Sequence, residues 1–283
     1  MKLFGLIVAL LLAFARVDGE GRRPVVIDTD GAADDLRAIC LLLSSPLVEV
    51  RAIVSSEGAL TPREAARKVR ALLRALGREE IPVGEGRATG LAPPPWRAHS
   101  RRVPWGEEEE DAPLDAVELL YRYAGDATIV ALGALTNPRD LLERRPSTRP
   151  RDMVWYNGRG DLRDGANYAA DPDAAARVLS SGIPVEIVSG ERGAFAVDEA
   201  LLRLLAASRL GAARLVVSSH RSPALRALVS AGHLRSWDDL AALRLIAPDL
   251  FVVRALSPSV ALVALEEGEA ARVEFLRVLG AGD

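Results

Sequence analysis

Four aspartates stand within eight residues near the start of the chain, at Asp28, Asp30, Asp34 and Asp35. Carboxylates this close repel one another, and a bound cation is the simplest relief of that repulsion. The apolar residues 25–27 before them are typical of a buried strand, and the periodic apolar residues after them are typical of a helix. The carboxylates are therefore expected at the carboxyl end of a strand, where open α/β sheets bind their ligands.

The rest of the chain predicts the sheet that positions this loop. A capping box of Thr61, Pro62 and Glu64 marks the start of one helix. The alternation of strands and helices predicts one α/β domain over residues 16–283, with a mainly parallel, doubly wound central sheet flanked by helices. Strands are predicted at 25–27, 48–55, 81–84, 127–132, 153–156, 184–189, 251–256 and 260–265, and helices at 36–43, 62–77, 114–123, 171–179, 201–208, 224–230 and 239–246.

The first 15 residues have the pattern of a secretory signal peptide. A basic start at Lys2 is followed by an apolar run that ends in Ala13-Phe14-Ala15. This pattern predicts export, to the periplasm or the medium. An uncleaved anchor is the alternative, although the run is too short to span a bilayer comfortably. No later segment is apolar enough to cross a membrane, so no membrane partner is expected after cleavage.

Composition excludes several classes of protein. The net charge is −3 and the cationic residues are scattered, so the sequence has no electrostatic footprint for nucleic acid. Cys40 is the only cysteine, which excludes an internal disulfide and a cysteine-based zinc site. Its place on the apolar face of the first predicted helix indicates a small buried residue.

The aspartate-rich loop resembles the N-terminal metal motif of the nucleoside hydrolase family, in which such a loop holds a calcium ion. Three further stretches occur in the order of that family: Ala134-Leu135-Thr136-Asn137-Pro138, then Asn167 to Asp171-Pro172, and then Trp237-Asp238-Asp239-Leu240-Ala241. Together they extend from residue 25 to about residue 251.

The resemblance implies a calcium cofactor. Its protein ligands would be the carboxylates of Asp30, Asp35 and Asp238 and the backbone carbonyl of Thr136, with Asp28 supporting the loop from behind. This all-oxygen set suits calcium, a hard cation that accepts backbone carbonyls and water.

The resemblance also implies the reaction, which is calcium-dependent hydrolysis of the N-glycosidic bond of a nucleoside to free base and ribose. Asp30 would act as the general base, and Asp34, Asn167 and Asp238 would bind the ribose. Carboxylates around the sugar stabilise the positive charge that develops on the ring as the base departs. A small nucleoside is therefore the expected partner. Homo-oligomers are common in the family.

Two tryptophans favour one branch of the family. Many members carry a histidine before the last metal aspartate, whereas this chain has Trp237. It resembles the purine-specific, inosine-adenosine-guanosine-preferring branch, where a tryptophan at this position stacks on the purine and promotes its departure. Trp96, in the long loop after the third predicted strand, fits the second stacking residue. The alternatives are that Trp237 belongs to the core and that Trp96 anchors its loop.

Several positions depart from the family pattern and keep other hypotheses open. Ala32, Ala59 and Gly165 replace polar residues that recognise the sugar, which favours an exported, calcium-dependent nucleoside- or sugar-binding protein without turnover as an alternative. A strand followed by Asp-x-Asp-Gly also opens phosphatases of the haloacid dehalogenase type. However, those enzymes need a late cation, usually a lysine, and the only lysines here are Lys2 and Lys68.

Overall fold

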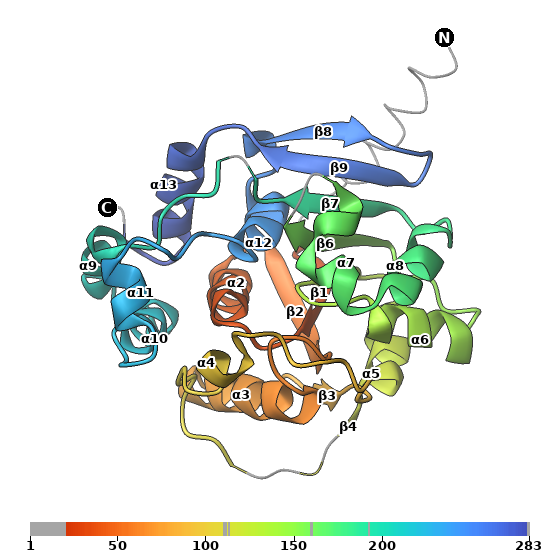
Figure 1. Cartoon of the computed structure of the whole chain (residues 1–283), viewed down its shortest axis with the longest axis horizontal. Helices are drawn as coiled ribbons and strands as arrows, with labels where there is room; N and C mark the ends of the chain where they lie inside the picture. Colours follow the sequence, from red (N-terminus) through yellow and green to blue (C-terminus); the bar gives the residue numbers. More distant parts are fainter. Residues whose placement is uncertain (1–20, 110–111, 113, 159–160, 192, 282–283) are drawn as a thin grey trace.

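The computed structural model describes residues 21–109, 112, 114–158, 161–191 and 193–281, so the predicted signal peptide lies outside the described residues. Its strands are β1 (Arg23–Thr29), β2 (Val48–Ser55), β3 (Val83–Glu85), β4 (Leu114–Asp115), β5 (Thr128–Ala131), β6 (Asp152–Gly158), β7 (Val185–Ser189), β8 (Phe251–Ala255) and β9 (Val260–Leu265). They form one sheet in the order β4-β3-β2-β1-β5-β6-β7-β9-β8 (Figure 1). Only β8 and β9 pair antiparallel among these strands, so the predicted α/β fold with a mainly parallel sheet is confirmed.

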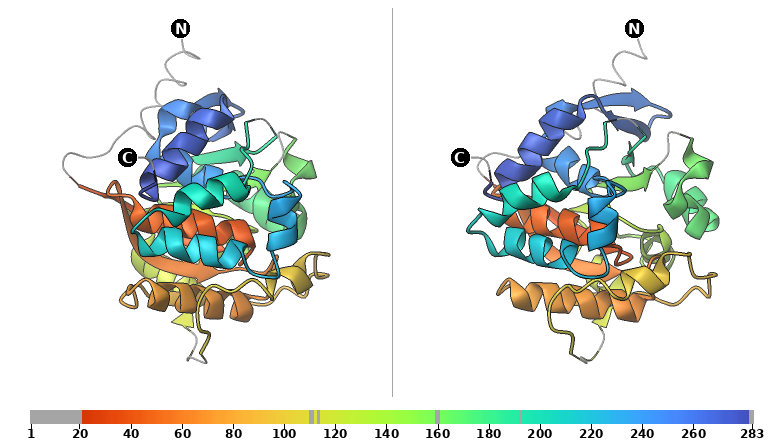
Figure 2. Two further views of the ribbon diagram at one scale, coloured as in Figure 1. Left: turned by 90° about the vertical axis from the view of Figure 1, so that its left-hand side faces the viewer. Right: turned by 60° about the vertical axis from the view of Figure 1, so that its left-hand side comes forward.

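Helices cover both faces of the sheet because successive side chains of a strand point to opposite faces. In β1, Val25 and Ile27 join one apolar cluster and Val26 joins the other. The first face carries α2 (Ala33–Ser44), α3 (Pro62–Ala75), α9 (Glu199–Ala206), α10 (Gly211–His220), α12 (Asp239–Ile246) and α13 (Gly268–Val278). The second carries α5 (Ala116–Tyr123), α6 (Thr136–Arg144) and α8 (Pro172–Leu179). Figure 2 shows the first layer, with α3, α2 and α13 stacked from bottom to top.

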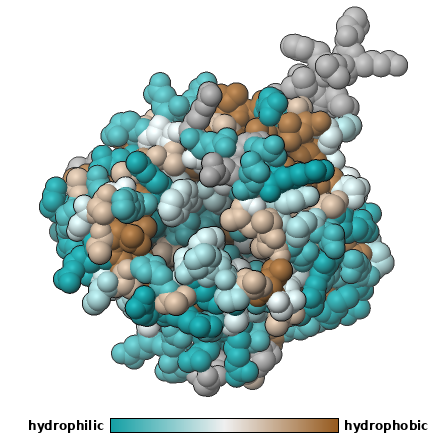
Figure 3. All heavy atoms as spheres, viewed as in Figure 1, coloured by the Kyte–Doolittle hydropathy of each residue, from teal (hydrophilic) through white to brown (hydrophobic). Residues whose placement is uncertain are grey.

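Shorter elements complete the described chain. They are α4 (Arg97–Ser100), α7 (Ala166–Ala170), α11 (Arg226–Ser230) and the 3-10 helices η1 (Leu162–Asp164) and η2 (Pro248–Leu250). Hydrophilic side chains cover most of the face seen in Figure 3, and apolar ones gather near β8 and β9. No helix within the described residues combines the length and the apolar character needed to cross a bilayer.

Local signals in the sequence account for several helix boundaries. The capping box at the start of α3 is present, because Thr61 accepts a bond from the backbone of Glu64 while the Glu64 side chain accepts one from the backbone of Thr61. Asp171 caps α8 by accepting the N–H of Ala174 at 3.0 Å. Cys40 is fully buried on α2, as predicted.

Three of the longer helices in the structure were not predicted, α6 in the middle of the chain and α10 and α13 in its last third. In α10 and α13 the buried residues do recur at helical spacing, as Ala212, Val216 and His220 show, so the pattern was present in the sequence and was missed. His220 is the last residue of α10 and is fully buried. Arg37 donates a hydrogen bond of 2.8 Å to Nε2 of His220, so the ring hydrogen of His220 is on Nδ1. Nδ1 of His220 donates to the carbonyl of Val216 at 2.9 Å.

Burial of His220 predicts a measurable loss of stability in acid. Burial, and then the neighbouring Arg37, lower the pKa of His220 from 6.5 to about 3. The unfolded chain therefore binds a proton between these pH values that the folded chain does not. The free energy of unfolding of the wild type, relative to His220→Gln, should fall as pH decreases from 6.5 toward about 3, by up to about 1.4 kcal/mol per pH unit. Urea denaturation of both proteins across this range measures the difference, and parallel curves would contradict the prediction.

Candidate active site

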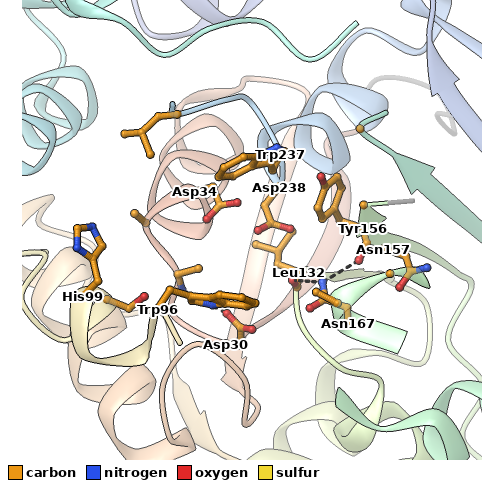
Figure 4. A pocket seen from close by; sticks show the side chains of 18 of the residues that line it. Asp30, Asp34, Trp96, His99, Leu132, Tyr156, Asn157, Asn167, Trp237 and Asp238 are labelled. Carbon is orange, nitrogen blue, oxygen red and sulfur yellow. Dashed lines mark hydrogen bonds between the residues drawn. The ribbon is translucent and has the colours of Figure 1, made fainter. Parts of the chain in front are cut away.

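A cleft of about 760 Å³ opens at the carboxyl ends of the central strands. The strand order reverses between β1 and β5, because β2 lies beyond β1 on one side and β6 lies beyond β5 on the other. At such a point the loops diverge in opposite directions and leave a ligand crevice. The walls come from the segments after β1, β5, β6 and β7, from the loop that carries α4, and from the segment before α12 (Figure 4).

The loop after β1 is folded around one carboxylate. Oδ2 of Asp35 accepts the backbone N–H groups of Asp30 and Gly31, each at 3.0 Å, and also the hydroxyl of Thr29. Gly31 has a φ of +81°, and a Cβ atom there would lie 2.8 Å from Cδ1 of Leu60, so the turn requires glycine. The second oxygen of Asp35 has no hydrogen-bond partner among the described residues. It is therefore available to a ligand.

Three carboxylates lie close together at the N-terminus of α2. One oxygen from each of Asp34, Asp35 and Asp238 lies within 4.8 Å of the others. Burial first, and then the neighbouring carboxylates, raise the pKa values of Asp35 and Asp238. Oδ1 of Asp238 is buried and, like Oδ1 of Asp35, has no partner in the described part of the chain. A hard divalent cation fits this donor set, because it would satisfy both oxygens and cancel the repulsion.

Asp30 lies beside this cluster on the floor of the cleft. Its Oδ2 accepts the N–H of Ala59 at 3.0 Å, and its Oδ1 accepts the N–H of Ala32 at 3.3 Å. Burial raises the pKa of Asp30 to about 6, although the Ala59 N–H partly opposes the shift. Both oxygens are therefore fixed by backbone, an arrangement that suits a proton acceptor held in one orientation.

Asp28, predicted to support the loop from behind, lies beneath the cleft. Asp28 is fully buried and does not line the cleft. Its Oδ1 accepts Nδ2 of Asn137 at 3.1 Å, and its backbone carbonyl accepts the N–H of Leu132 at 2.8 Å. Burial raises the pKa of Asp28 to about 8. The residue therefore ties the loop after β5 to the loop after β1.

The structure does not bring Thr136 to the cleft. Thr136 is the first residue of α6, it is buried, and its hydroxyl donates to Oδ2 of Asp171 at 2.7 Å. Its carbonyl belongs to the helix, where carbonyls point along the axis. Leu132 lines the cleft instead, because β5 ends at Ala131 and the next backbone carbonyl faces the strand ends. The backbone oxygen that this segment offers to a cation is that of Leu132, which sequence reasoning missed.

Trp96 and Trp237 form two aromatic walls. Their exposed fractions are 49% and 37%, so neither belongs to the core. Figure 4 shows their indoles on opposite sides of a space in which the carboxylates of Asp34 and Asp238 also lie. A flat aromatic group can therefore enter between them, next to the carboxylate cluster.

A buried ion pair holds the loop of Trp96. Arg97 donates to the carbonyl of Gly58 at 2.8 Å, and its Nη2 lies 3.4 Å from Oε1 of Glu57. Oε2 of Glu57 accepts the backbone N–H groups of Thr89 and Gly90 at 2.6 and 3.2 Å. Glu57 lies two residues after the end of β2, so its carboxylate connects that strand to residues 89–90 and to Arg97 of the loop. This pair could not be predicted from the sequence, because contacts between loops follow no periodic pattern.

The predicted sugar-binding residue Asn167 lines the cleft. Its Nδ2 donates to the carbonyls of Leu132 at 2.7 Å and Tyr156 at 2.9 Å. A carbonyl oxygen has two lone pairs, so the Leu132 oxygen retains capacity for a second partner. Gly165 also lines the cleft, and a Cβ atom there would overlap the side chain and carbonyl of Asn157. Asn157 therefore excludes a side chain at position 165.

The sequence profile of the inosine-uridine preferring nucleoside hydrolase family matches residues 25–275. A curated relative, the pyrimidine-specific ribonucleoside hydrolase RihA of Citrobacter koseri, is 35% identical over 184 residues, which are 57% of this chain and 58% of that protein. The chain thus spans little more than half the length of the curated relatives it matches.

Two solved structures share the fold. The plant nucleoside hydrolase PpNRh1 has a TM-score of 0.76 at 20% identity and covers 92% of this chain and 100% of its own. The purine-preferring ribonucleoside hydrolase from Gardnerella vaginalis has a TM-score of 0.71 at 18% identity and covers 91% and 98%.

The fold and the cleft define a doubly wound α/β protein with a cluster of buried carboxylates beside an aromatic-walled pocket. With the profile match across most of its length, the chain belongs to the inosine-uridine preferring nucleoside hydrolase family.

Proposed function

We propose that the protein is a calcium-dependent N-ribohydrolase that cleaves purine nucleosides to free base and ribose. The observation that carries the proposal is the cluster of Asp34, Asp35 and Asp238 at the cleft lined by Trp96 and Trp237. Two buried oxygens of this cluster have no hydrogen-bond partner among the described residues. The cluster offers a place for a cation and a sugar, and the indoles offer a place for the base. Family membership supports the hydrolytic chemistry.

In the reaction, the water oxygen bonds to the anomeric carbon as the bond from that carbon to the base nitrogen breaks. The base nitrogen leaves with the electron pair of that bond and takes up a proton from solvent, so that the products are ribose and the neutral free base. Bound calcium, held by Asp34, Asp35, Asp238 and the Leu132 carbonyl, would polarise the attacking water. Asp30 accepts the proton that the water loses, since its carboxylate is fixed by two backbone N–H groups. The carboxylates around the ring stabilise the positive charge of the transition state.

The charge of the cleft favours nucleosides over nucleotides. Among the described residues, the lining contains no lysine or arginine, whereas five carboxylates line it: Asp30, Asp34, Asp164, Glu191 and Asp238. A phosphate group would meet these negative charges and no lysine or arginine among the described lining residues. The same feature argues against the haloacid dehalogenase chemistry, which needs a cation to hold a phosphoryl group.

A panel of purine and pyrimidine nucleosides, assayed for free base with calcium present, tests the proposed activity. Inosine, adenosine and guanosine should turn over faster than uridine and cytidine, because a bicyclic base covers more of two indoles. Release of uracil faster than hypoxanthine would overturn the purine preference and agree with the name of the relative from Citrobacter koseri. Tight binding of inosine without any base release would instead support the binding-protein alternative.

Substitution of Trp237 should separate binding of the base from binding of the cation. Loss of one stacking face removes about 1–3 kcal/mol, so Trp237→Ala should lower kcat/KM for purine nucleosides about 5–150-fold. Trp237→Phe keeps an aromatic face and should recover part of this loss. Calcium affinity, measured by calorimetry, should stay unchanged in both variants. Equal losses for inosine and uridine would contradict a stacking role specific to purines.

We also propose that the protein is exported, on the basis of the apolar run and small-residue ending in residues 1–15. Cell fractionation and N-terminal sequencing test this proposal. A mature chain that begins at Arg16 would support it, and unprocessed protein in the cytoplasm would overturn it.

A further inference from the structure

One buried arginine connects the two chain segments that build the cleft. Arg37 lies on α2, two residues after Asp35, and its side chain is 1% exposed. Its Nη2 lies 2.8 Å from Oδ2 of Asp239 and 2.8 Å from the backbone carbonyl of Arg235. Its Nε lies 3.1 Å from both oxygens of Asp239, and its Nη1 donates to His220 at 2.8 Å. Every nitrogen of the guanidinium thus has a buried partner.

The partners of Arg37 lie on both sides of Trp237 and Asp238 in the sequence. Arg235 is two residues before Trp237, and Asp239 is the residue directly after Asp238. A single side chain of α2 therefore holds both ends of the stretch that carries the aromatic wall and the third carboxylate. The same helix begins with Asp34 and Asp35. The relative position of the three carboxylates depends on this contact.

Stability alone does not explain such an arrangement. A buried ion pair contributes little net stability compared with two well-packed apolar side chains, because desolvation offsets the attraction. A guanidinium is a planar fork of five donors, so it fixes direction as well as distance, which a lysine ammonium does not. The geometry thus serves orientation more than stability.

We propose that Arg37 is a positioning residue that sets Trp237 and Asp238 in register with Asp34 and Asp35. In this role the guanidinium fixes the cation site and the wall for the base together, through Asp239 and the Arg235 carbonyl. The inference rests on the proposed function, since it concerns the cation site of that reaction.

The test is a calorimetric titration of Ca²⁺ into the wild type and into the double variant Arg37→Met/Asp239→Leu. The double variant removes the ion pair without leaving a buried charge, and thermal unfolding reports whether its fold persists. Calcium affinity should fall about 10–100-fold, as it does when residues that orient metal ligands are lost. The matched control is Arg23→Met/Asp152→Leu, which removes a buried pair with a 2.8 Å contact at the opposite ends of the strands. Its calcium affinity should equal that of the wild type.

A folded double variant with wild-type calcium affinity would overturn the positioning role. The single variant Arg37→Lys tests the positioning role independently, and it still does so if the double variant does not fold. Lysine keeps the charge but loses the fork, so weaker calcium binding supports the proposal and unchanged binding overturns it. Absence of calcium binding in the wild type would overturn the cation site itself, and with it this role. If only the positioning role is wrong, the wild type and all of its variants bind Ca²⁺ with the same affinity.

Discussion

Removal of divalent cations with EGTA should lower nucleoside turnover about 10³-fold or more, and added Ca²⁺ should restore it. A cation that polarises the attacking water contributes several kcal/mol to the transition state, and each 1.36 kcal/mol is a factor of ten in rate. The cluster of Asp34, Asp35 and Asp238 makes the dependence strong, because two of its buried oxygens have no other partner in the described residues. Release of hypoxanthine from inosine measures the effect.

Addition of Ca²⁺ to the EGTA-treated protein should also raise its melting temperature, since the cation binds the folded state and not the unfolded chain. Mg²⁺ is a suitable control ion. It demands octahedral geometry and retains its waters, so it should restore less activity than Ca²⁺ in a site built from fixed carboxylates. Full turnover by EGTA-treated protein, with no metal found by elemental analysis, would refute the role of the cation.

The early part of the site could be predicted from sequence because its information is local. The order of apolar strand, Asp-Gly turn and amphipathic helix fixes where Asp30, Asp34 and Asp35 lie, and no distant residue is needed to infer it. The doubly wound sheet followed from the alternation of elements for the same reason. The predicted fold is confirmed, with the ends of the predicted elements shifted by one or a few residues, and the roles of the three aspartates stay predictions.

Contacts between distant segments could not be predicted in this way. The prediction of a backbone ligand at Thr136 depends on where β5 ends, which a motif does not state. β5 ends at Ala131, so the residue of this segment that lines the cleft is Leu132, whose carbonyl accepts Nδ2 of Asn167, and Thr136 already belongs to α6. The ion pair of Arg37 and Asp239 joins residues 202 positions apart, and no local pattern in either helix predicts it.

Asp30→Asn should abolish hydrolysis while it preserves the fold and the bound cation. The amide cannot accept a proton from the attacking water, so kcat should fall by about 10³–10⁴-fold, the upper range for loss of a positioned base. Asparagine keeps one oxygen, which can still accept the N–H of Ala59 at the present 3.0 Å. Its NH₂ would then face the N–H of Ala32, where the existing bond is longer at 3.3 Å, so the loss of stability should be near 1 kcal/mol.

Calorimetry decides which of two roles Asp30 has. Asp34, Asp35 and Asp238 remain in Asp30→Asn and form the cluster by themselves, so calcium affinity should persist while turnover is lost. Weakened calcium binding in proportion to the loss of rate would make Asp30 a cation ligand first and a base second. Asp173→Asn, the same change on the exposed first turn of α8, is the control and should match the wild type. Unchanged turnover in Asp30→Asn would remove Asp30 as the base, and the proton would then have to leave by way of another carboxylate of the cleft.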